Sequence, residues 1–221
     1  MLIEVRAKNC YAFDEEIQFS MKADMRNKKF GSNVHKENNF NVLKTAGIYG
    51  PNNTGKTCLI KCIKAIKNVL LNKDKEMMPN IFTNNTICEL GVTFLSLGRK
   101  FSYDFKYDVK ENQFIYESFY EILKDQYNNE KEICWLKKDT ISEEYECLDP
   151  SLKDVIPVVS KNNLLYYVTD TNKFEHINRM KEILVGFASK IDVINMNNIP
   201  ISNTIEVMKN TNQIQEKVVE F

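Results

Sequence analysis

The sequence lacks any long apolar run, and this limits where the protein can work. Its longest continuous apolar stretches, such as 155–159, contain only a few residues, whereas a membrane-spanning helix needs about 20. Near the amino terminus, Glu4 and Arg6 interrupt the apolar core that a secretory signal peptide requires. We therefore expect a cytoplasmic protein that has no membrane partner.

The sequence also lacks net charge, because its 30 basic and 30 acidic residues balance at pH 7. A balanced chain has no overall field that attracts nucleic acid or a membrane surface. Composition therefore gives no support for nucleic-acid binding, although a local basic patch would escape this test.

Cysteine pairs with metal-ligand spacing are absent as well. The six cysteines contain no CxxC pair, which argues against a zinc site, and a chain of 221 residues is too long to favour a disulfide framework. Cys58 and Cys62 are one helical turn apart, but we interpret them as small apolar core residues.

Glycine is scarce, and three of the seven glycines lie close together at positions 47, 50 and 55. Segment 50–57 satisfies the Walker A, or P-loop, pattern G-x-x-x-x-G-K-[ST] in full. Its glycines allow a turn that aims backbone N–H groups at phosphate. Lys56 is expected to reach the β- and γ-phosphates, and the Thr57 hydroxyl to ligate magnesium. The predicted cofactors are ATP and Mg²⁺, with Lys56 as the catalytic residue and Thr57 as the metal ligand. The predicted nucleotide-binding residues are Gly50, Pro51, Asn52, Asn53, Thr54, Gly55, Lys56, Thr57 and Cys58.

The segments on both sides of this loop fit a strand–loop–helix unit. Residues 46–49 form a short apolar run, which we expect to be a buried strand, and 57–71 has an apolar face with helical spacing. Lys61, Lys64 and Lys67 lie away from that face, and we favour a solvated helix surface over a stripe that binds nucleic acid.

Further strands are expected from alternating patterns. Segments 2–6 and 17–21 fit strands, and the alternation over 90–120, broken at Gly98 and at 111–112, predicts a three-stranded antiparallel meander. Its aromatic stripe is interpreted as core rather than as a base-stacking platform. Segment 124–153 is expected to be irregular, 174–187 helical, and a last helix is expected to begin near Asn203, with Glu206 completing a capping box.

The motifs resemble the amino-terminal lobe of ABC-type ATPase heads of the SMC, RecF and OLD kind, including bacterial "AAA family ATPase" proteins found in anti-phage systems. Segment 8–13 looks like the NFxSF segment of that group, 48–57 has its typical P-loop filling, and the 90–120 meander looks like its lobe sheet. The resemblance implies an α/β fold: a P-loop NTPase lobe with a mixed sheet, an antiparallel meander and the P-loop helix, followed by a mostly helical segment. It implies an ATPase lobe over 1–125 and an incomplete, partly helical continuation over 126–221. A small GTPase is not supported, because the chain has no DxxG turn and no NKxD guanine reader.

Several parts of such a head are missing from the sequence. There is no Gly-Gly and hence no signature segment, and the Walker B lookalike at 164–170 ends in Asp170 without a following glutamate. His35 and His176 do not match a switch histidine, and Gln113 and Gln126 are the candidates for a Q-loop glutamine.

We therefore expect the ATP-binding half of an ATPase head, of an anti-phage or DNA-maintenance system, that hydrolyses ATP only when a Walker B and signature half completes it. The abrupt apolar end at Phe221 leads to the same expectation. The implied partners are a second copy or a complementary carboxy-terminal half, and a nuclease effector. Two alternatives stay open: a nucleotide-sensing module that does not hydrolyse, and a small P-loop kinase, which the four scattered arginines disfavour.

Overall fold

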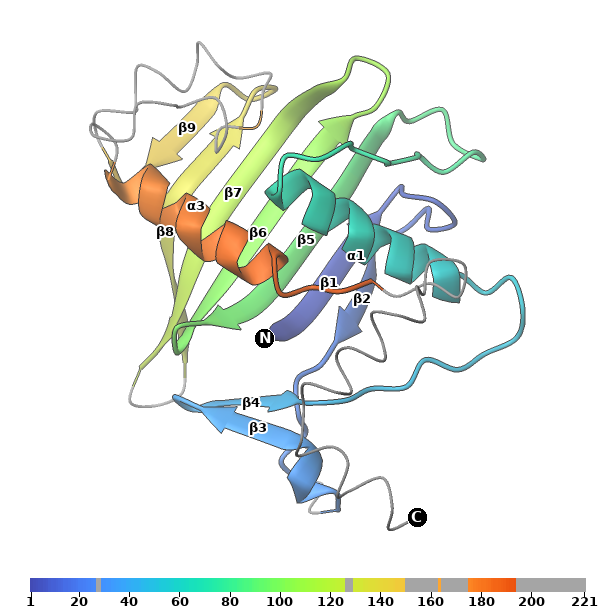
Figure 1. Cartoon of the computed structure of the whole chain (residues 1–221). Coiled ribbons are helices and arrows are strands. Elements are labelled where there is room, and N and C mark those ends of the chain that lie inside the picture. The colour runs from blue at the N-terminus through green and yellow to red at the C-terminus, as the bar shows by residue number, and fades with distance from the viewer. Residues whose placement is uncertain (27–28, 126–128, 150–162, 164–174, 194–221) are drawn as a thin grey trace, which may run out of the picture. The chain divides into compact units, whose positions relative to one another are not determined.

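The computed structural model describes residues 1–26, 29–125, 129–149, 163 and 175–193. The chain divides into two compact units, Met1–Ile191 and Asp192–Phe221, and every element labelled in Figure 1 belongs to the first. The last helix expected near Asn203 and the segment 164–170 lie outside the described residues.

A single seven-stranded sheet dominates the first unit (Figure 1). Every pair of neighbouring strands in the described sheet is antiparallel. In spatial order the strands are β2 (Ile17–Ser20), β1 (Leu2–Lys8), β5 (Ile87–Ser96), β6 (Arg99–Asp108), β7 (Gln113–Lys124), β8 (Glu130–Asp139) and β9 (Glu144–Cys147). A separate hairpin sheet follows the short 3-10 helix η1 (Gly31–Asn33) and consists of β3 (Val34–Glu37) and β4 (Phe40–Leu43).

Two helices, α1 (Lys56–Leu70) and α3 (Glu175–Ala188), lie across one face of the seven-stranded sheet (Figure 1). The aromatic stripe of the meander faces them and forms the core, as the alternation predicted. The Phe94 ring of β5 stacks on Phe187 of α3 with centroids 4.0 Å apart. A buried ion pair lies among these side chains, with Lys138 Nζ 2.6 Å from Glu117 Oε2 and the Tyr103 hydroxyl donating to the other carboxylate oxygen.

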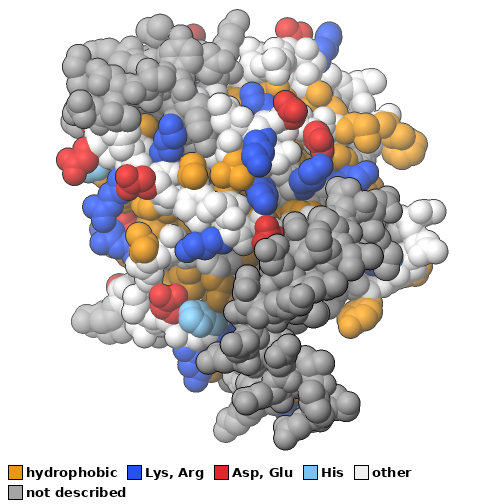
Figure 2. Space-filling model, viewed as in Figure 1, with side chains coloured by type: hydrophobic (Ala, Val, Ile, Leu, Met, Phe, Trp, Pro, Cys, Tyr) orange, Lys and Arg blue, Asp and Glu red, His pale blue; other side chains and the backbone are white. Residues whose placement is uncertain are grey.

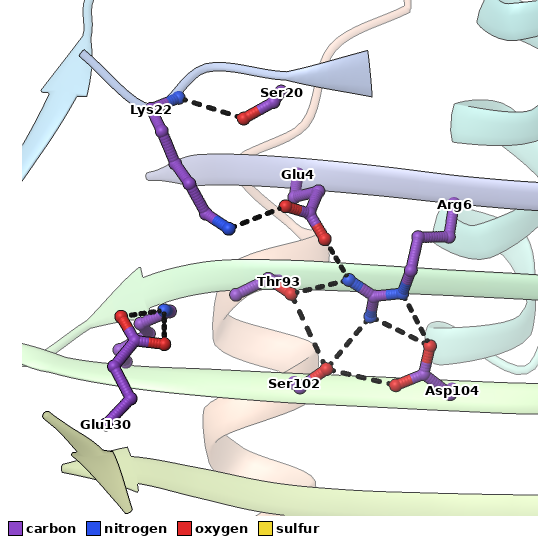
Figure 3. A network of polar contacts seen from close by, with 9 residues as sticks. Glu4, Arg6, Ser20, Lys22, Thr93, Ser102, Asp104 and Glu130 are labelled. Carbon is purple, nitrogen blue, oxygen red and sulfur yellow. Dashed lines mark hydrogen bonds and ion pairs between the residues drawn. The ribbon is translucent and has the colours of Figure 1, made fainter. Parts of the chain in front are cut away.

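The opposite face of the sheet carries a polar network centred on Arg6 (Figure 3). Its guanidinium donates to Asp104 and Glu4, and to the hydroxyls of Thr93 and Ser102, at 2.6–2.9 Å. Gly91 is required here, because a β-carbon at this position would lie 1.9 Å from Asp104 Oδ1. The network joins β1, β5 and β6 with nearly every donor satisfied, so it fixes the register of the central strands.

This architecture overturns the fold class inferred from the resemblance. In its described residues the protein is a mainly antiparallel sheet with two α-helices, not a parallel or mixed P-loop α/β lobe. Residues 46–49 do not form a strand, and Tyr49 is 93% exposed. A buried P-loop strand needs a neighbouring strand on each side to satisfy its backbone. Within the described residues no strand pairs with 46–49, so the run has no regular secondary structure and lies exposed on the surface.

The other local predictions had mixed outcomes. The 90–120 meander is present as β5, β6 and β7, and the helices predicted over 57–71 and 174–187 are α1 and α3. The prediction that 124–153 is irregular was wrong, because β8 (Glu130–Asp139) and β9 (Glu144–Cys147) extend the sheet within this segment. In β8, Glu130, Lys131 and Glu132 are exposed, whereas Trp135, Leu136 and Lys138 are buried. The alternation of a half-buried strand was hidden by the buried charge of Lys138 and by a bulge in the β7–β8 pairing.

Candidate functional site

The Walker A segment forms the loop that leads directly into α1. Asn53 and Gly55 both have positive φ angles, of 65° and 89°, and Gly55 is the residue before the first helical turn. Asparagine and glycine are the residues that tolerate this left-handed conformation best, so the residue types explain why the loop curls here. The curl places 52–55 at the amino-terminal end of a 15-residue helix, where free backbone N–H groups and the helix dipole attract anions.

The Lys56 side chain folds back over this loop. Its ammonium donates to the Gly50 carbonyl at 2.7 Å, to the Pro51 carbonyl and, at 3.4 Å, to the Thr54 hydroxyl, which itself donates to Pro51. The first turn of α1 contains no acidic residue. The loop therefore surrounds one positive charge. Within the described residues, the hydrogen-bond partners of this charge are neutral oxygens only.

The connection between β1 and β2 supplies a wall for the loop. The Phe13 ring lies against Gly55, because a β-carbon added there would be 2.9 Å from its Cε1 atom. This connection is itself anchored: Asn9 Nδ2 donates to the carbonyls of Asn85 and Ile87, and the Tyr11 N–H donates to the Met78 carbonyl. Segment 8–13 stood out in the sequence only because it resembles a segment of ABC-type ATPase heads. Nothing in the sequence predicts that Phe13 contacts Gly55.

Two open cavities flank the loop and share Gly55 and Lys56. One, of about 610 Å³, is lined by Ala12 and by residues 52, 53 and 55–58. The other, of about 410 Å³, has largely apolar walls that include Phe13, Ile17 and Phe19. Among the residues described, no aspartate or glutamate lines either cavity. The two cavities together offer a polar, positively charged compartment beside an apolar one.

The structure brings all nine predicted nucleotide-binding residues together, since they are consecutive in one loop and helix start. Thr57 is exposed and Cys58 half-buried, and both line the larger cavity.

The candidates for a Q-loop glutamine and a switch histidine lie elsewhere. Gln113 pairs with Asp108 at the β6–β7 turn, His35 contacts Glu37, and Gln126 is outside the described residues. His176 lies edge-on to Trp135. Neither histidine lines a cavity of the loop.

The lysines of α1 have partners within the chain. Lys64 pairs with Glu76 at 2.6 Å, Lys67 donates to the Ile191 carbonyl, and Lys61 lies over the Tyr11 ring. Figure 2 shows basic side chains on this face mixed with apolar and acidic ones. These contacts favour a structural role for the helix surface over a stripe for nucleic acid.

The cysteines contribute to the core. Cys10, Cys62 and Cys88 are fully buried, and all six cysteines are free thiols. A hydrogen bond with Cys10 and burial raise the pKa of the Cys88 thiol, which keeps it protonated and unreactive. In the described part of the chain, no cluster of three or more His, Cys, Asp or Glu side chains is arranged to hold a metal.

Comparison with known proteins adds no relative to this picture: no protein-family model matches the chain, and no curated protein matches it. Among the described helices, none has the length and apolar character that crossing a membrane would require. The functional argument is therefore built on the geometry of the loop itself.

Proposed function

We propose that this protein binds the triphosphate of ATP, together with Mg²⁺, at residues 50–57. One observation carries the proposal: a complete Walker A pattern forms a curled loop at the start of a helix, around the Lys56 ammonium and beside a cavity of about 610 Å³. Each part of this arrangement favours a polyphosphate anion.

The residues fit a phosphate ligand without rearrangement of the core. The Lys56 ammonium now bonds neutral carbonyls of Gly50 and Pro51, and exchanging them for anionic phosphate oxygens gives shorter and stronger charge-assisted bonds. Thr57 is exposed in the same cavity, where its hydroxyl would serve as a magnesium ligand. Bound Mg²⁺ would neutralise charge on the β- and γ-phosphates.

The neighbouring apolar cavity supports a nucleotide over inorganic phosphate as the ligand. Phe13, Ile17 and Phe19 offer apolar surface within the same pocket as Gly55 and Lys56. A ligand with a polyphosphate at one end and a flat base at the other matches this division into a charged and an apolar compartment. The chain has no guanine-reading motif, so ATP is the proposed nucleotide.

Binding without unaided hydrolysis is the second part of the proposal. Hydrolysis needs a group that orients the attacking water, and in the described residues neither cavity has a carboxylate in its lining. The heads that the sequence resembles obtain this group from a Walker B segment and a facing signature. We propose that turnover requires such a segment, in a second copy or a complementary half, and that a nuclease is a fitting effector.

A nucleotide-sensing module that never hydrolyses is the second candidate, and the same observation favours it. In that case ATP binding would itself be the signal. The two candidates differ in whether any partner segment restores turnover.

Titration calorimetry with MgATP, MgADP and MgGTP tests the binding site. We expect saturable MgATP binding, and Lys56→Ala should weaken it by about 10-fold or more, because it removes charge-assisted bonds to phosphate. Lys61→Ala, which removes a lysine from the same helix outside the cavities, is the matched control and should bind like the wild type. Equal affinity of wild type and Lys56→Ala would refute the P-loop as the site. Rapid steady-state hydrolysis by the chain alone would refute the dependence on another segment.

A further inference from the structure

A second cluster of positive charge lies far from the P-loop in sequence, where the β3–β4 hairpin meets the seven-stranded sheet. The hairpin is anchored there by a small apolar cluster of Ile3, Phe40, Val42 and Leu95. Beside this cluster is a cavity of about 210 Å³, whose lining includes Lys22, Lys100, Lys124 and Glu130. Three ammonium groups face one carboxylate of the lining, Glu130, and Glu4 pairs with Lys22 from outside the lining, so one positive charge remains in excess.

The most buried of the three lysines is Lys100, with 3% of its side chain exposed. Its ammonium is held by both oxygens of Glu130 at 2.7 Å, yet the Glu130 side chain is 44% exposed. The cation is thus in the wall of the cavity and its carboxylate partner at the mouth. A desolvated ammonium attracts anions more strongly than one in water, so an incoming anion would compete with Glu130.

The other two lysines are bound less completely. Lys124 donates to the Asn39 carbonyl at 2.9 Å and lies over the Phe40 ring, which Lys100 also faces. Lys22 pairs with Glu4 at 2.9 Å, but Glu4 also accepts from Arg6 (Figure 3). Lys124 therefore has no carboxylate partner among the described residues, and Lys22 shares one.

We propose that this cavity binds a small oxyanion, namely a phosphate or diphosphate group. Its volume is below the roughly 300–1,000 Å³ typical of pockets for drug-sized ligands, so it suits one anionic group rather than a whole nucleotide. Lysine is a common point-charge ligand of phosphate, and three lysines from separate elements converge here. Glu130 acts as an internal competitor that sets the affinity. The site is independent of the P-loop.

The test uses the full chain carrying Lys56→Ala, so that the P-loop does not take up the probe. Inorganic phosphate, pyrophosphate and glycerol 3-phosphate are titrated by calorimetry, and succinate serves as a dicarboxylate comparison. We expect saturable binding of at least one phosphate probe with a Kd of about 1 mM or tighter. The ranking of the three probes shows whether a free anion or a phosphate ester is preferred. Because Lys56 is already absent, failure here leaves the proposed ATP site untouched.

Variants of the lining make the assignment specific. Lys124→Ala and Lys22→Ala should each weaken binding by about fivefold or more, whereas Glu130→Gln should strengthen it by about threefold or more, since it removes the competing charge. Lys36→Ala, an exposed lysine on the same hairpin, is the matched control and should change nothing. Thermal unfolding of each variant checks that the fold is retained. No saturable binding, binding unaffected by Lys22 and Lys124, or succinate binding as tight as phosphate would overturn the proposal.

Discussion

The Phe13 ring occupies the space beside Gly55 that a β-carbon would need, with its Cε1 atom 2.9 Å from the position of that carbon. The contact joins the β1–β2 connection to the P-loop and leaves room only for a hydrogen atom. Gly55 also has a φ angle of 89°, which residues with a side chain rarely adopt. Two independent constraints therefore require glycine at one position of the candidate site.

Gly55→Ala should weaken MgATP binding by about 10-fold or more. The new methyl group meets the Phe13 ring, and the left-handed backbone costs a residue with a side chain about 1–2 kcal/mol, so the loop must shift. Calorimetric titration measures the affinity. Gly31→Ala, whose β-carbon meets nothing within 4 Å, should bind normally. If Phe13→Ala combined with Gly55→Ala restored full affinity, the clash alone would be responsible; partial recovery is expected because the backbone strain remains.

Thr57→Ala should remove most of the gain in ATP affinity that Mg²⁺ provides, while binding of metal-free ATP changes little. The proposed role of Thr57 is to ligate the metal, whereas Lys56 contacts phosphate directly. Titrations of ATP with Mg²⁺ and with EDTA separate the two contributions. Thr57→Ser keeps the hydroxyl and should retain the Mg²⁺ effect. A Mg²⁺ effect of normal size in Thr57→Ala would contradict the assignment.

Lys138→Met should lower the free energy of unfolding by about 3–5 kcal/mol, because it leaves the Glu117 carboxylate buried without its cation. Urea denaturation measures the loss. Adding Glu117→Leu to Lys138→Met should recover much of it, since the buried charge is then gone. Lys137→Met is the matched control: Lys137 pairs with the exposed Glu144, and solvent-screened surface pairs contribute little to stability, so this variant should unfold like the wild type. A double variant no more stable than Lys138→Met would argue against the ion pair as the cause.

Acid should destabilise the protein partly through Glu4. Burial by itself would raise the pKa of Glu4, but hydrogen bonds from Lys22, Gln18 and Arg6 outweigh it and lower the pKa from 4.5 to about 2. A depressed carboxyl pKa stabilises the fold above pH 4.5, and this stabilisation is lost as the pH falls towards 2. We expect Glu4 to account for about 1–2 kcal/mol of that loss, less than the full pKa shift implies, because its partner Lys22 is half-exposed and screened by solvent.

Denaturation of wild type and Glu4→Gln across this pH range measures the contribution of Glu4. Glu4→Gln should be less stable at neutral pH and should lose less stability between pH 4.5 and pH 2. Parallel stability curves for the two proteins would show that Glu4 is not the titrating group.

Local features of this protein were predictable from the sequence. The Walker A loop was recognised because its pattern is a run of consecutive residues. The backbone preferences of these residues favour the turn without help from distant segments. The meander was found because alternation over 90–120 reflects the pleat of the strands. Helices α1 and α3 followed from apolar residues that recur with the period of a helix. In each case a short segment contains the whole signal.

Contacts between distant segments were not predictable in this way. The apolar run at 46–49 fits a strand by composition, but a strand exists only where a neighbour pairs with it, and the described neighbours do not. Segment 124–153 fits no simple pattern, yet β8 and β9 form because β7 offers them an edge. Likewise, Phe13 meets Gly55 across about 40 positions of the chain, and Lys22, Lys100 and Lys124 meet in one cavity.

The sequence by itself thus determined the Walker A loop and the type of most elements, since these follow from local backbone preference and periodicity. Only the tertiary structure decided that the sheet is antiparallel throughout its described strands, which aromatic ring closes on the P-loop, and which lysines share a cavity. These outcomes depend on the balance of packing and polar satisfaction among segments far apart in the chain, and no local pattern encodes that balance.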